Sequence, residues 1–156
     1  MRAFLAASAV ALAPLAINQG TITVNQGTNG VTLGMARSTV IALLGKPVYK
    51  NANGLLQYGP NSGPVIFDVY LNTATNRVRL ISISGSKFCT TAGVCMLKNG
   101  GIAKLKAQYG TKLKLVKTED GEQLYQVNGT FGQKKVFTSF APAPHGQIIQ
   151  IFIGYL

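Results

Sequence analysis

Few residues in this chain have the chemistry that catalysis or metal binding requires. The single histidine, His145, lies among prolines and glycine, which predicts an exposed loop with no partner to orient a general base. Three acidic residues, Glu119, Asp120 and Glu122, cluster in a predicted hairpin turn. A solvated turn is favoured there over acid–base catalysis or calcium binding. We therefore expect no enzyme activity, no catalytic or metal site and no cofactor.

Asp68 is the acidic residue that falls inside a predicted strand. In residues 65–71, alternation places Ile66, Asp68 and Tyr70 on one face and the other four residues, all apolar, on the core-facing side. Because charged residues on an outer strand face pair across strands, we expect an ion pair between Asp68 and Arg77 or Arg79 of the next strand.

The two cysteines, Cys89 and Cys95, have five residues between them, including Gly93. This spacing can close a small loop. A metal pair is the alternative, but no histidine or acidic residue lies near either cysteine, and two thiols do not complete a tetrahedral site. We expect a disulfide, which by loop-closure entropy would contribute roughly 2–2.5 kcal/mol.

The N-terminal residues 1–17 carry one positive charge followed by an apolar run of small residues, a pattern typical of a secretory signal peptide. The run is short for a membrane span, which needs about 20 apolar residues. The alternatives are an uncleaved membrane anchor or a buried N-terminal helix. Export predicts a location in the cell envelope or outside the cell, where a disulfide persists.

The charge balance is strongly basic, with 15 Lys and Arg against 4 Asp and Glu, a net charge of +11. Such a protein is drawn to anionic partners such as a wall polymer or a membrane surface, although solubility alone is the alternative. The candidate anion-binding residues are in the densest basic run: Lys112, Lys114 and Lys117. A solvated strand edge is the alternative. Nucleic acid is not expected, because no basic stripe with interleaved aromatics is present.

Two short helices organise the rest of the chain. In residues 34–47, Met35, Thr39/Val40, Leu43 and Leu44 recur at spacings of three and four, which is typical of a helix, while Gly45 and Pro47 end it. Residues 100–110 repeat the pattern and also end at a glycine. Helices this short are not stable alone in water, so their apolar stripes must be buried.

Three predicted strands follow each helix, and the same order of elements returns about 65 to 70 residues further on, which indicates a duplicated unit. The sequence predicts an α+β protein: two tandem α-β-β-β units that form an antiparallel sheet with both helices on one face. Asn128-Gly129 is typical of a hairpin turn. The expected boundaries are 1–17 signal peptide, 18–33 linker or edge strand, 34–88 first unit, 89–97 disulfide-closed connector and 98–156 second unit.

Short motifs carry a resemblance to two families. Gly34, Val40, Leu44-Gly45 and Pro47, followed by Tyr58, resemble the helix signature of the β-lactamase inhibitory protein and of the SmpA/OmlA (BamE) lipoproteins. The resemblance covers residues 33–155 and is weaker in the second unit, which lacks the proline. It implies a concave sheet surface opposite the helices, and it marks a fold more than an activity.

The expected function is therefore that of an exported binding protein that holds a protein partner on the exposed sheet face. The alternative is a basic envelope-structural protein retained by charge on an anionic wall polymer or membrane surface. The candidate binding-face residues are Tyr58, Asp68, Tyr70, Arg77, Arg79, Tyr125 and Lys135.

Overall fold

The computed structural model describes residues 17, 19–59, 65–85 and 87–156. Residues 1–16 of the predicted signal peptide lie outside the described residues. Among the described residues, no helix has the length and apolar character needed to cross a lipid bilayer.

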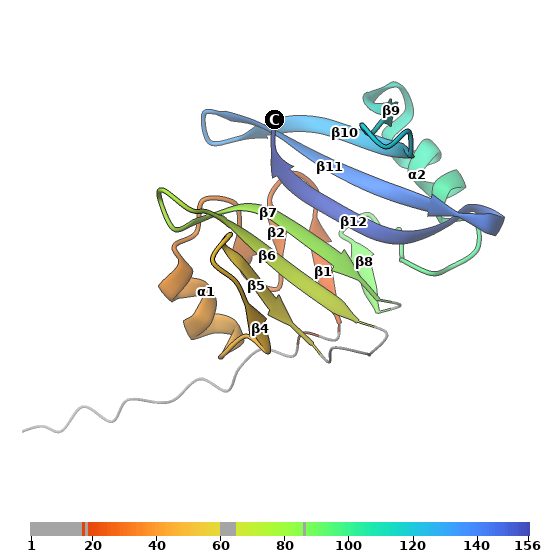
Figure 1. Cartoon of the computed structure of the whole chain (residues 1–156). Coiled ribbons are helices and arrows are strands. Elements are labelled where there is room, and N and C mark those ends of the chain that lie inside the picture. Colours follow the sequence, from red (N-terminus) through yellow and green to blue (C-terminus); the bar gives the residue numbers. More distant parts are fainter. Residues whose placement is uncertain (1–16, 18, 60–64, 86) are drawn as a thin grey trace, which may run out of the picture.

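The main sheet has eight strands in the order β4-β5-β6-β7-β12-β11-β10-β9, and its neighbouring strands are antiparallel. Strands β4 to β7, which follow helix α1, form one half of this sheet, and β9 to β12, which follow helix α2, form the other (Figure 1). The predicted antiparallel α+β fold is thus confirmed. The strands are β4 (Tyr49–Lys50), β5 (Leu55–Tyr58), β6 (Ile66–Asn72), β7 (Arg77–Ser84), β9 (Leu113–Lys117), β10 (Gln123–Phe131), β11 (Lys134–Ala143) and β12 (Gln147–Tyr155).

One side of the main sheet, which we term the core face, is apolar and buried. Residues directly opposite each other in antiparallel strands point to the same side, so the register defines the row that forms it. Burial of this row supplies much of the stabilising apolar contact. The row is Leu56, Val69, Ile81, Ile153, Thr138 and Val127.

A second, smaller sheet covers the core face, in the order β3-β2-β1-β8. Its strands are β1 (Gly20–Thr23), β2 (Gly27–Thr28), β3 (Val31–Thr32) and β8 (Phe88–Thr90). Ile22, Val31 and Phe88 are fully buried. The segment 18–33 was expected to be a linker or one edge strand. Its described residues form three short strands, and β1 pairs with β8 in a separate layer that buries apolar residues of the core.

A polar contact ties the small sheet to the main sheet. In the β1–β2 turn, the Asn25 backbone N–H donates to the Thr138 hydroxyl oxygen at 2.7 Å, and that hydroxyl donates to Asn25 Oδ1 at 3.1 Å. Thr138 is fully buried, so this exchange satisfies a hydroxyl that would otherwise be costly inside the core.

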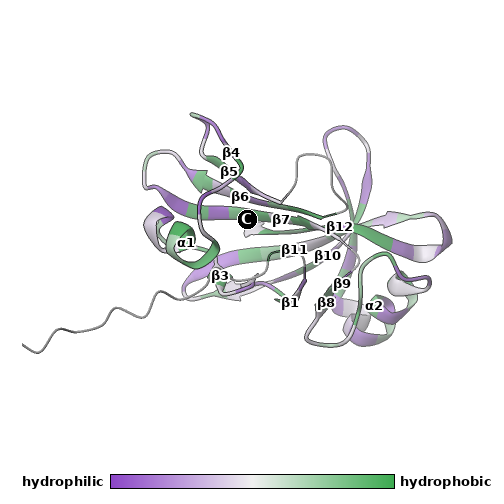
Figure 2. Ribbon diagram, turned by 90° about the horizontal axis from the view of Figure 1, so that it is seen from below, coloured by the Kyte–Doolittle hydropathy of each residue, from purple (hydrophilic) through white to green (hydrophobic). Residues whose placement is uncertain are grey.

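The two helices are α1 (Arg37–Leu44) and α2 (Gly101–Tyr109), and they lie with the small sheet on the same side of the main sheet (Figure 2). Val40 and Leu44 are the buried apolar residues of α1, and Ile102 and Leu105 are those of α2. At the end of α1, Gly45 has φ 82° and its N–H donates to the Ile41 carbonyl at 2.8 Å. Only glycine adopts this conformation easily, which explains the predicted stop.

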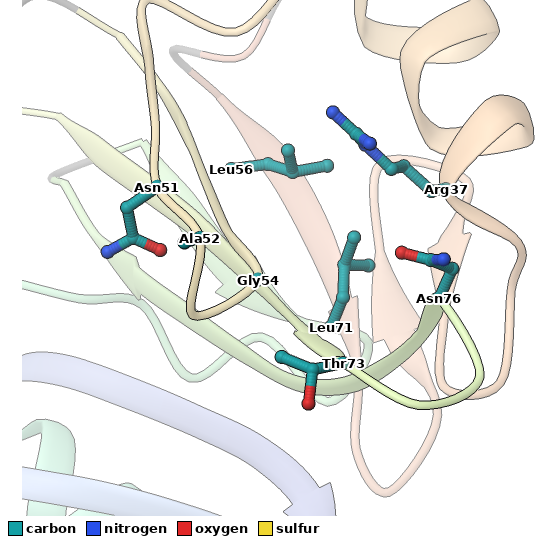
Figure 3. A pocket seen from close by; sticks show the side chains of 8 residues that line it. All are labelled: Arg37, Asn51, Ala52, Gly54, Leu56, Leu71, Thr73 and Asn76. Carbon is teal, nitrogen blue, oxygen red and sulfur yellow. The ribbon is translucent and has the colours of Figure 1, made fainter.

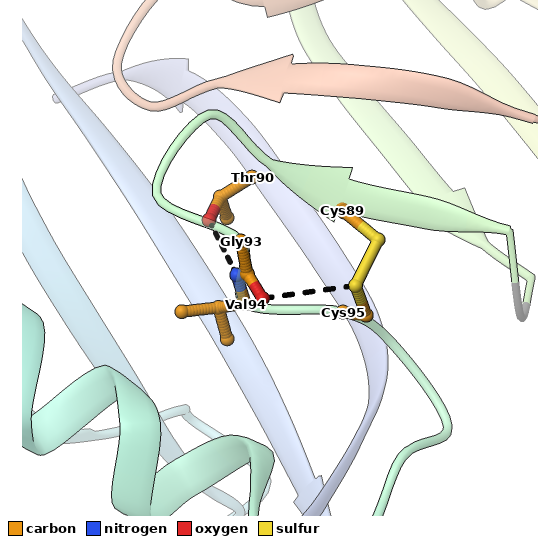
Figure 4. The surroundings of a disulfide bond; sticks show 5 residues. All are labelled: Cys89, Thr90, Gly93, Val94 and Cys95. Atoms are coloured by element: carbon orange, nitrogen blue, oxygen red, sulfur yellow. Dashed lines mark hydrogen bonds between the residues drawn. A yellow bond between two sulfur atoms is a disulfide. The ribbon is translucent and has the colours of Figure 1, made fainter.

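Cys89 and Cys95 form a disulfide that joins β8 to the segment leading into α2 (Figure 4). The same small loop is held by hydrogen bonds from the Val94 N–H to the Thr90 hydroxyl at 3.1 Å and from the Gly93 N–H to the Thr90 carbonyl at 2.8 Å. The predicted pairing is confirmed, and it fixes the start of the second half of the chain to the small sheet.

Truncating Ile22 tests whether the N-terminal segment is part of the core. Ile22→Ala should lower the free energy of unfolding by about 2–5 kcal/mol, because a buried isoleucine leaves a cavity. Urea denaturation followed by circular dichroism measures this change. The control Thr21→Ala, at an exposed neighbour, should stay within about 0.5 kcal/mol. Equal effects of the two substitutions would contradict the assignment of the segment to the core.

Removing the disulfide should destabilise the fold without abolishing it. Since the closed loop is short, Cys89→Ser with Cys95→Ser should lower the free energy of unfolding by about 2 kcal/mol through the larger entropy of the unfolded chain. Urea unfolding of wild type with and without reductant should give the same difference. No effect of reductant on wild type would contradict this.

Candidate functional site

The side of the main sheet opposite the core face is the candidate site, and we term it the open face. None of the described helices and none of the small-sheet strands lies on it (Figure 2). The register gives its central row, which crosses from one edge of the sheet toward the other. The row consists of Gln57, Asp68, Ser82, Phe152, Ser139, Gln126 and Lys114.

Hydrogen bonds between side chains hold the residues of this row in place. Gln150 Nε2 donates to the Ser82 hydroxyl at 2.9 Å, and the Ser139 hydroxyl donates to Gln126 Oε1 at 2.9 Å. Gln126 Nε2 in turn donates to Asn128 Oδ1 at 2.7 Å. Both serines are buried, so the centre of the open face is a fixed polar framework rather than a set of mobile side chains.

Asp68 lies in this row between Gln57 and Ser82, on the outer side as predicted. Burial raises the pKa of its carboxyl group, and a hydrogen bond with Gln57 partly offsets that effect. Its Oδ1 atom is buried and has no hydrogen-bond partner. The expected ion pair was wrong: neither Arg77 nor Arg79 contributes to the pKa of this carboxyl group, whose side-chain partner is Gln57.

Arg77 and Arg79 bind other groups. The Arg77 Nη1 atom donates to the Gly34 carbonyl at 2.8 Å, which ties the start of the α1 segment to β7. Arg79 falls where the β6–β7 register shifts, and its Cζ atom lies 5.9 Å from the centre of the Tyr70 ring. Burial and the charge of Asp68 raise the pKa of Tyr70, while Arg79 lowers it. Asp68, Tyr70 and Arg79 thus form one group on the open face.

An apolar hollow of about 240 Å³ lies on the open face beside this group. Its walls come from both halves of the sheet, and Thr118 and Glu122 of the β9–β10 turn stand at its rim. Leu80 and Phe137 close over Gly154, where a Cβ atom would come within 2.8 Å of Leu80 and 3.0 Å of Phe137. The apolar lining residues are Leu80, Leu124, Phe137 and Phe152.

A second hollow of about 350 Å³ adjoins the first, since Glu122 and Leu124 line both. Ala141, Pro142 and the exposed Ile149 supply its apolar lining. The turn at the shared rim is held by the Glu122 N–H, which donates to the Thr118 hydroxyl at 3.0 Å. Together the two hollows make an apolar depression on a face whose other residues are mainly polar.

The prediction was wrong for two binding-face residues, Tyr58 and Tyr125, because they lie on the core face. Both stand in the core-face row that includes Phe67 and Phe140. Tyr58 is buried and packs edge-on against Phe67, and burial raises its pKa to about 12 despite the nearby charge of Arg37. Tyr125 lies beneath α2, with Lys106 Nζ 5.3 Å from its ring centre.

The predicted basic residues are spread over different surfaces. Lys135 alternates with the buried Val136 and so lies on the open face, near its edge. Of the candidate anion-binding residues, Lys114 belongs to the open-face row, whereas Lys117 points to the other side of β9. Lys112 ends a turn of 3₁₀ helix (Gly110–Lys112) and is not in the strand as expected. These three lysines do not form one surface.

The apolar hollow was not predicted. Phe152 sits in an unbroken apolar run in β12, which hides the alternation that separates the two faces. A usable signal was present, because Phe152 shares its side with Gln150 and alternates with the buried Ile151 and Ile153. A large apolar residue on the polar side of a strand is informative.

Residues with catalytic potential are dispersed. His145 is exposed in a 3₁₀ turn (Pro144–Gly146) at φ 63°. Among the described residues, no three His, Cys, Asp or Glu side chains are placed to share a metal ion.

A solved structure has a similar fold. The crystal structure of YjgB from Bacillus subtilis, a DUF4309 family protein, matches with a TM-score of 0.56 and 14% sequence identity, over 85% of this chain and 88% of that one. At this identity the match shows a shared sheet-rich α+β fold alone. No family model matches the chain, and no curated protein matches it. The comparisons give no support for the resemblance to the β-lactamase inhibitory protein or the SmpA/OmlA family.

The raised pKa of Asp68 predicts a pH-dependent stability difference. The folded state favours the protonated carboxyl group, so the carboxylate costs stability above the unfolded value of 3.8, and that cost disappears as the pH falls below it. Asp68→Asn should therefore raise the urea midpoint at pH 7 and lose this advantage below about pH 4. Asp120→Asn, in the exposed turn, should change neither midpoint. A lower midpoint for Asp68→Asn at pH 7 would show that the carboxylate is stabilised.

Proposed function

We propose that this chain is an exported, non-enzymatic binding protein that holds a protein partner on its open face. The observation that carries the proposal is the apolar depression formed by the two adjoining hollows. An apolar side chain of the partner would insert between Leu80, Phe137 and Phe152, and the surrounding polar row would supply hydrogen bonds. Buried apolar anchors within a polar rim are the usual anatomy of protein interfaces.

The rigidity of the face supports this function. Ser82 and Ser139 are buried and hydrogen-bonded, so little side-chain entropy would be lost when a partner covers them. Tyr70 and Arg79 extend the same surface with an aromatic ring and a guanidinium group, two side-chain types enriched at interface hot spots.

The expected compartment agrees with the disulfide. A bond between Cys89 and Cys95 persists where the environment is oxidising. We therefore place the binding event in the cell envelope or outside the cell, as the N-terminal pattern predicts.

We further propose that the two halves of the chain are copies of one α-β-β-β unit. The mirrored strand order supports this, since α1 precedes β4 to β7 and α2 precedes β9 to β12 in corresponding positions. The depression would then lie at the junction of the two copies.

Partner capture with a matched pair of variants tests the function. Immobilised wild type, Phe152→Ser and Leu115→Ser would be exposed to the secreted and envelope fraction of the source cells and washed in about 1 M salt, where the Debye length is about 3 Å. Leu115 is 54% exposed and lies on β9, away from the depression. A partner should stay on wild type and Leu115→Ser, and its affinity for Phe152→Ser should fall about 30-fold, the effect of losing a hot spot of about 2 kcal/mol.

Two outcomes would contradict this proposal. If every bound protein leaves in salt, or if Phe152→Ser retains the partner as well as wild type does, the open face is not the binding surface. Circular dichroism of each variant ensures that the comparison is made between folded proteins.

A further inference from the structure

Arg37 is the first residue of α1, and its side chain is only partly satisfied by the fold. Its Nε atom is buried and has no hydrogen-bond partner. Figure 3 shows the side chain leaving the start of the helix and extending toward Leu56, with the Asn76 side chain beside it. A buried guanidinium donor ordinarily has an acceptor, because an unmade charged hydrogen bond is costly.

Two pockets meet at Arg37. The first, of about 190 Å³, is lined by Arg37 together with polar groups of Asn51, Thr73 and Asn76 and the apolar side chains of Leu56 and Leu71. The second, of about 240 Å³, lies between α1 and β4. Arg37 shares it with Ile41, Lys46, Pro47, Val48, Tyr49 and Lys50. Arg37 therefore lines pockets on two sides of the same region.

The charges around these pockets are of one sign. Neither lining contains a carboxylate, whereas Arg37, Lys46 and Lys50 contribute three cations. The acidic residues of the chain lie elsewhere: Asp68 is on the open face, and the others are in the turn after β9. Since β4 and β9 are opposite edges of the main sheet, the positive region is not neutralised from that turn.

A second buried donor lies near the first. The Tyr58 hydroxyl is also buried without a hydrogen-bond partner; burial raises its pKa to about 12, and the nearby charge of Arg37 partly offsets that rise. Tyr58 lines neither pocket, so Arg37 is the donor that a ligand in this region can reach.

We propose that the cleft between α1 and β4 binds a phosphate group through the Arg37 guanidinium, with Lys46 and Lys50 as additional cations. The planar fork of arginine matches phosphate oxygens and supplies two parallel hydrogen bonds, which lysine cannot do. Three cations suit a phosphate better than a singly charged carboxylate. This site is separate from the apolar depression and does not depend on the proposed protein partner.

The test follows the arginine side chains by nuclear magnetic resonance. Inorganic phosphate is titrated into the ¹⁵N-labelled protein at constant ionic strength, and the Nε–Hε signals of Arg37 and Arg79 are compared. The Arg37 signal should shift to saturation, and the Arg79 signal should not. Arg37→Lys keeps the charge but loses the fork, so the affinity should fall about 10-fold or more. Arg79→Lys should leave it unchanged.

Substitutions of exposed lysines test the site without disturbing the fold. Lys46 and Lys50 are exposed, so Lys46→Gln with Lys50→Gln should fold normally and weaken phosphate binding several-fold. Lys114→Gln with Lys117→Gln removes the same charge from the opposite edge and should have no effect. Equal loss in both pairs, equal shifts at both arginines, or equal binding of acetate would overturn the proposal.

The source of the phosphate group can be found with two further probes. Glycerol phosphate presents the group in solution, and vesicles of phosphatidylglycerol present it on a surface. Tighter, Arg37-dependent binding to one of the two identifies the source. Failure of both probes and of inorganic phosphate would overturn this inference and leave the proposal for the open face intact.

Discussion

The pairing of β7 with β12 is the constraint on which the rest of the structure depends. Ile81 and Ile83 stand opposite Ile153 and Ile151, and all four are fully buried. This pairing merges strands from the two halves of the chain into one sheet of eight, so that two exposed edges become an interior junction. The hollow on the open face exists because of it, since Leu80 comes from β7 whereas Phe152 and Phe137 come from β12 and β11.

A sheet of this width must bury one face, and two short helices cannot cover it alone. With 8 and 9 residues, α1 and α2 each bury only a few side chains. The small sheet fills the space between them, and the Asn25–Thr138 hydrogen bonds attach it to β11. The small sheet and both helices share one side, so the open face remains available.

Three of the four acidic residues lie at one edge of the main sheet, in the turn after β9. The region around α1 and β4 gathers cations without nearby carboxylates, whereas the turn between β9 and β10 carries Glu119, Asp120 and Glu122. The apolar depression has Glu122 at its rim, and the positive cleft has Arg37 within it. The apolar depression and the positively charged cleft thus lie on different sides of one sheet, and they suit different ligands.

The sequence by itself determined the local features. Gly45 and Gly110 end the two helices because a positive φ is required there, and the Cys89–Cys95 spacing permits the bond that forms. The alternation of polar and apolar residues also predicted most of the strands. These features depend on residues a few positions apart, so the necessary information is contiguous in the chain.

Only the tertiary structure decided which side each strand turned to the core and what covered it. Adjacent leucines in β5 leave its alternation ambiguous, and pairing of Tyr58 with Phe67 placed the tyrosine inside. Asn128-Gly129 is typical of a turn but lies within β10, where Asn25 packs so closely that a Cβ atom on Gly129 would clash with it. The first choice depends on strand pairing, and the second on a contact between residues about a hundred positions apart. Neither leaves a local pattern in the sequence.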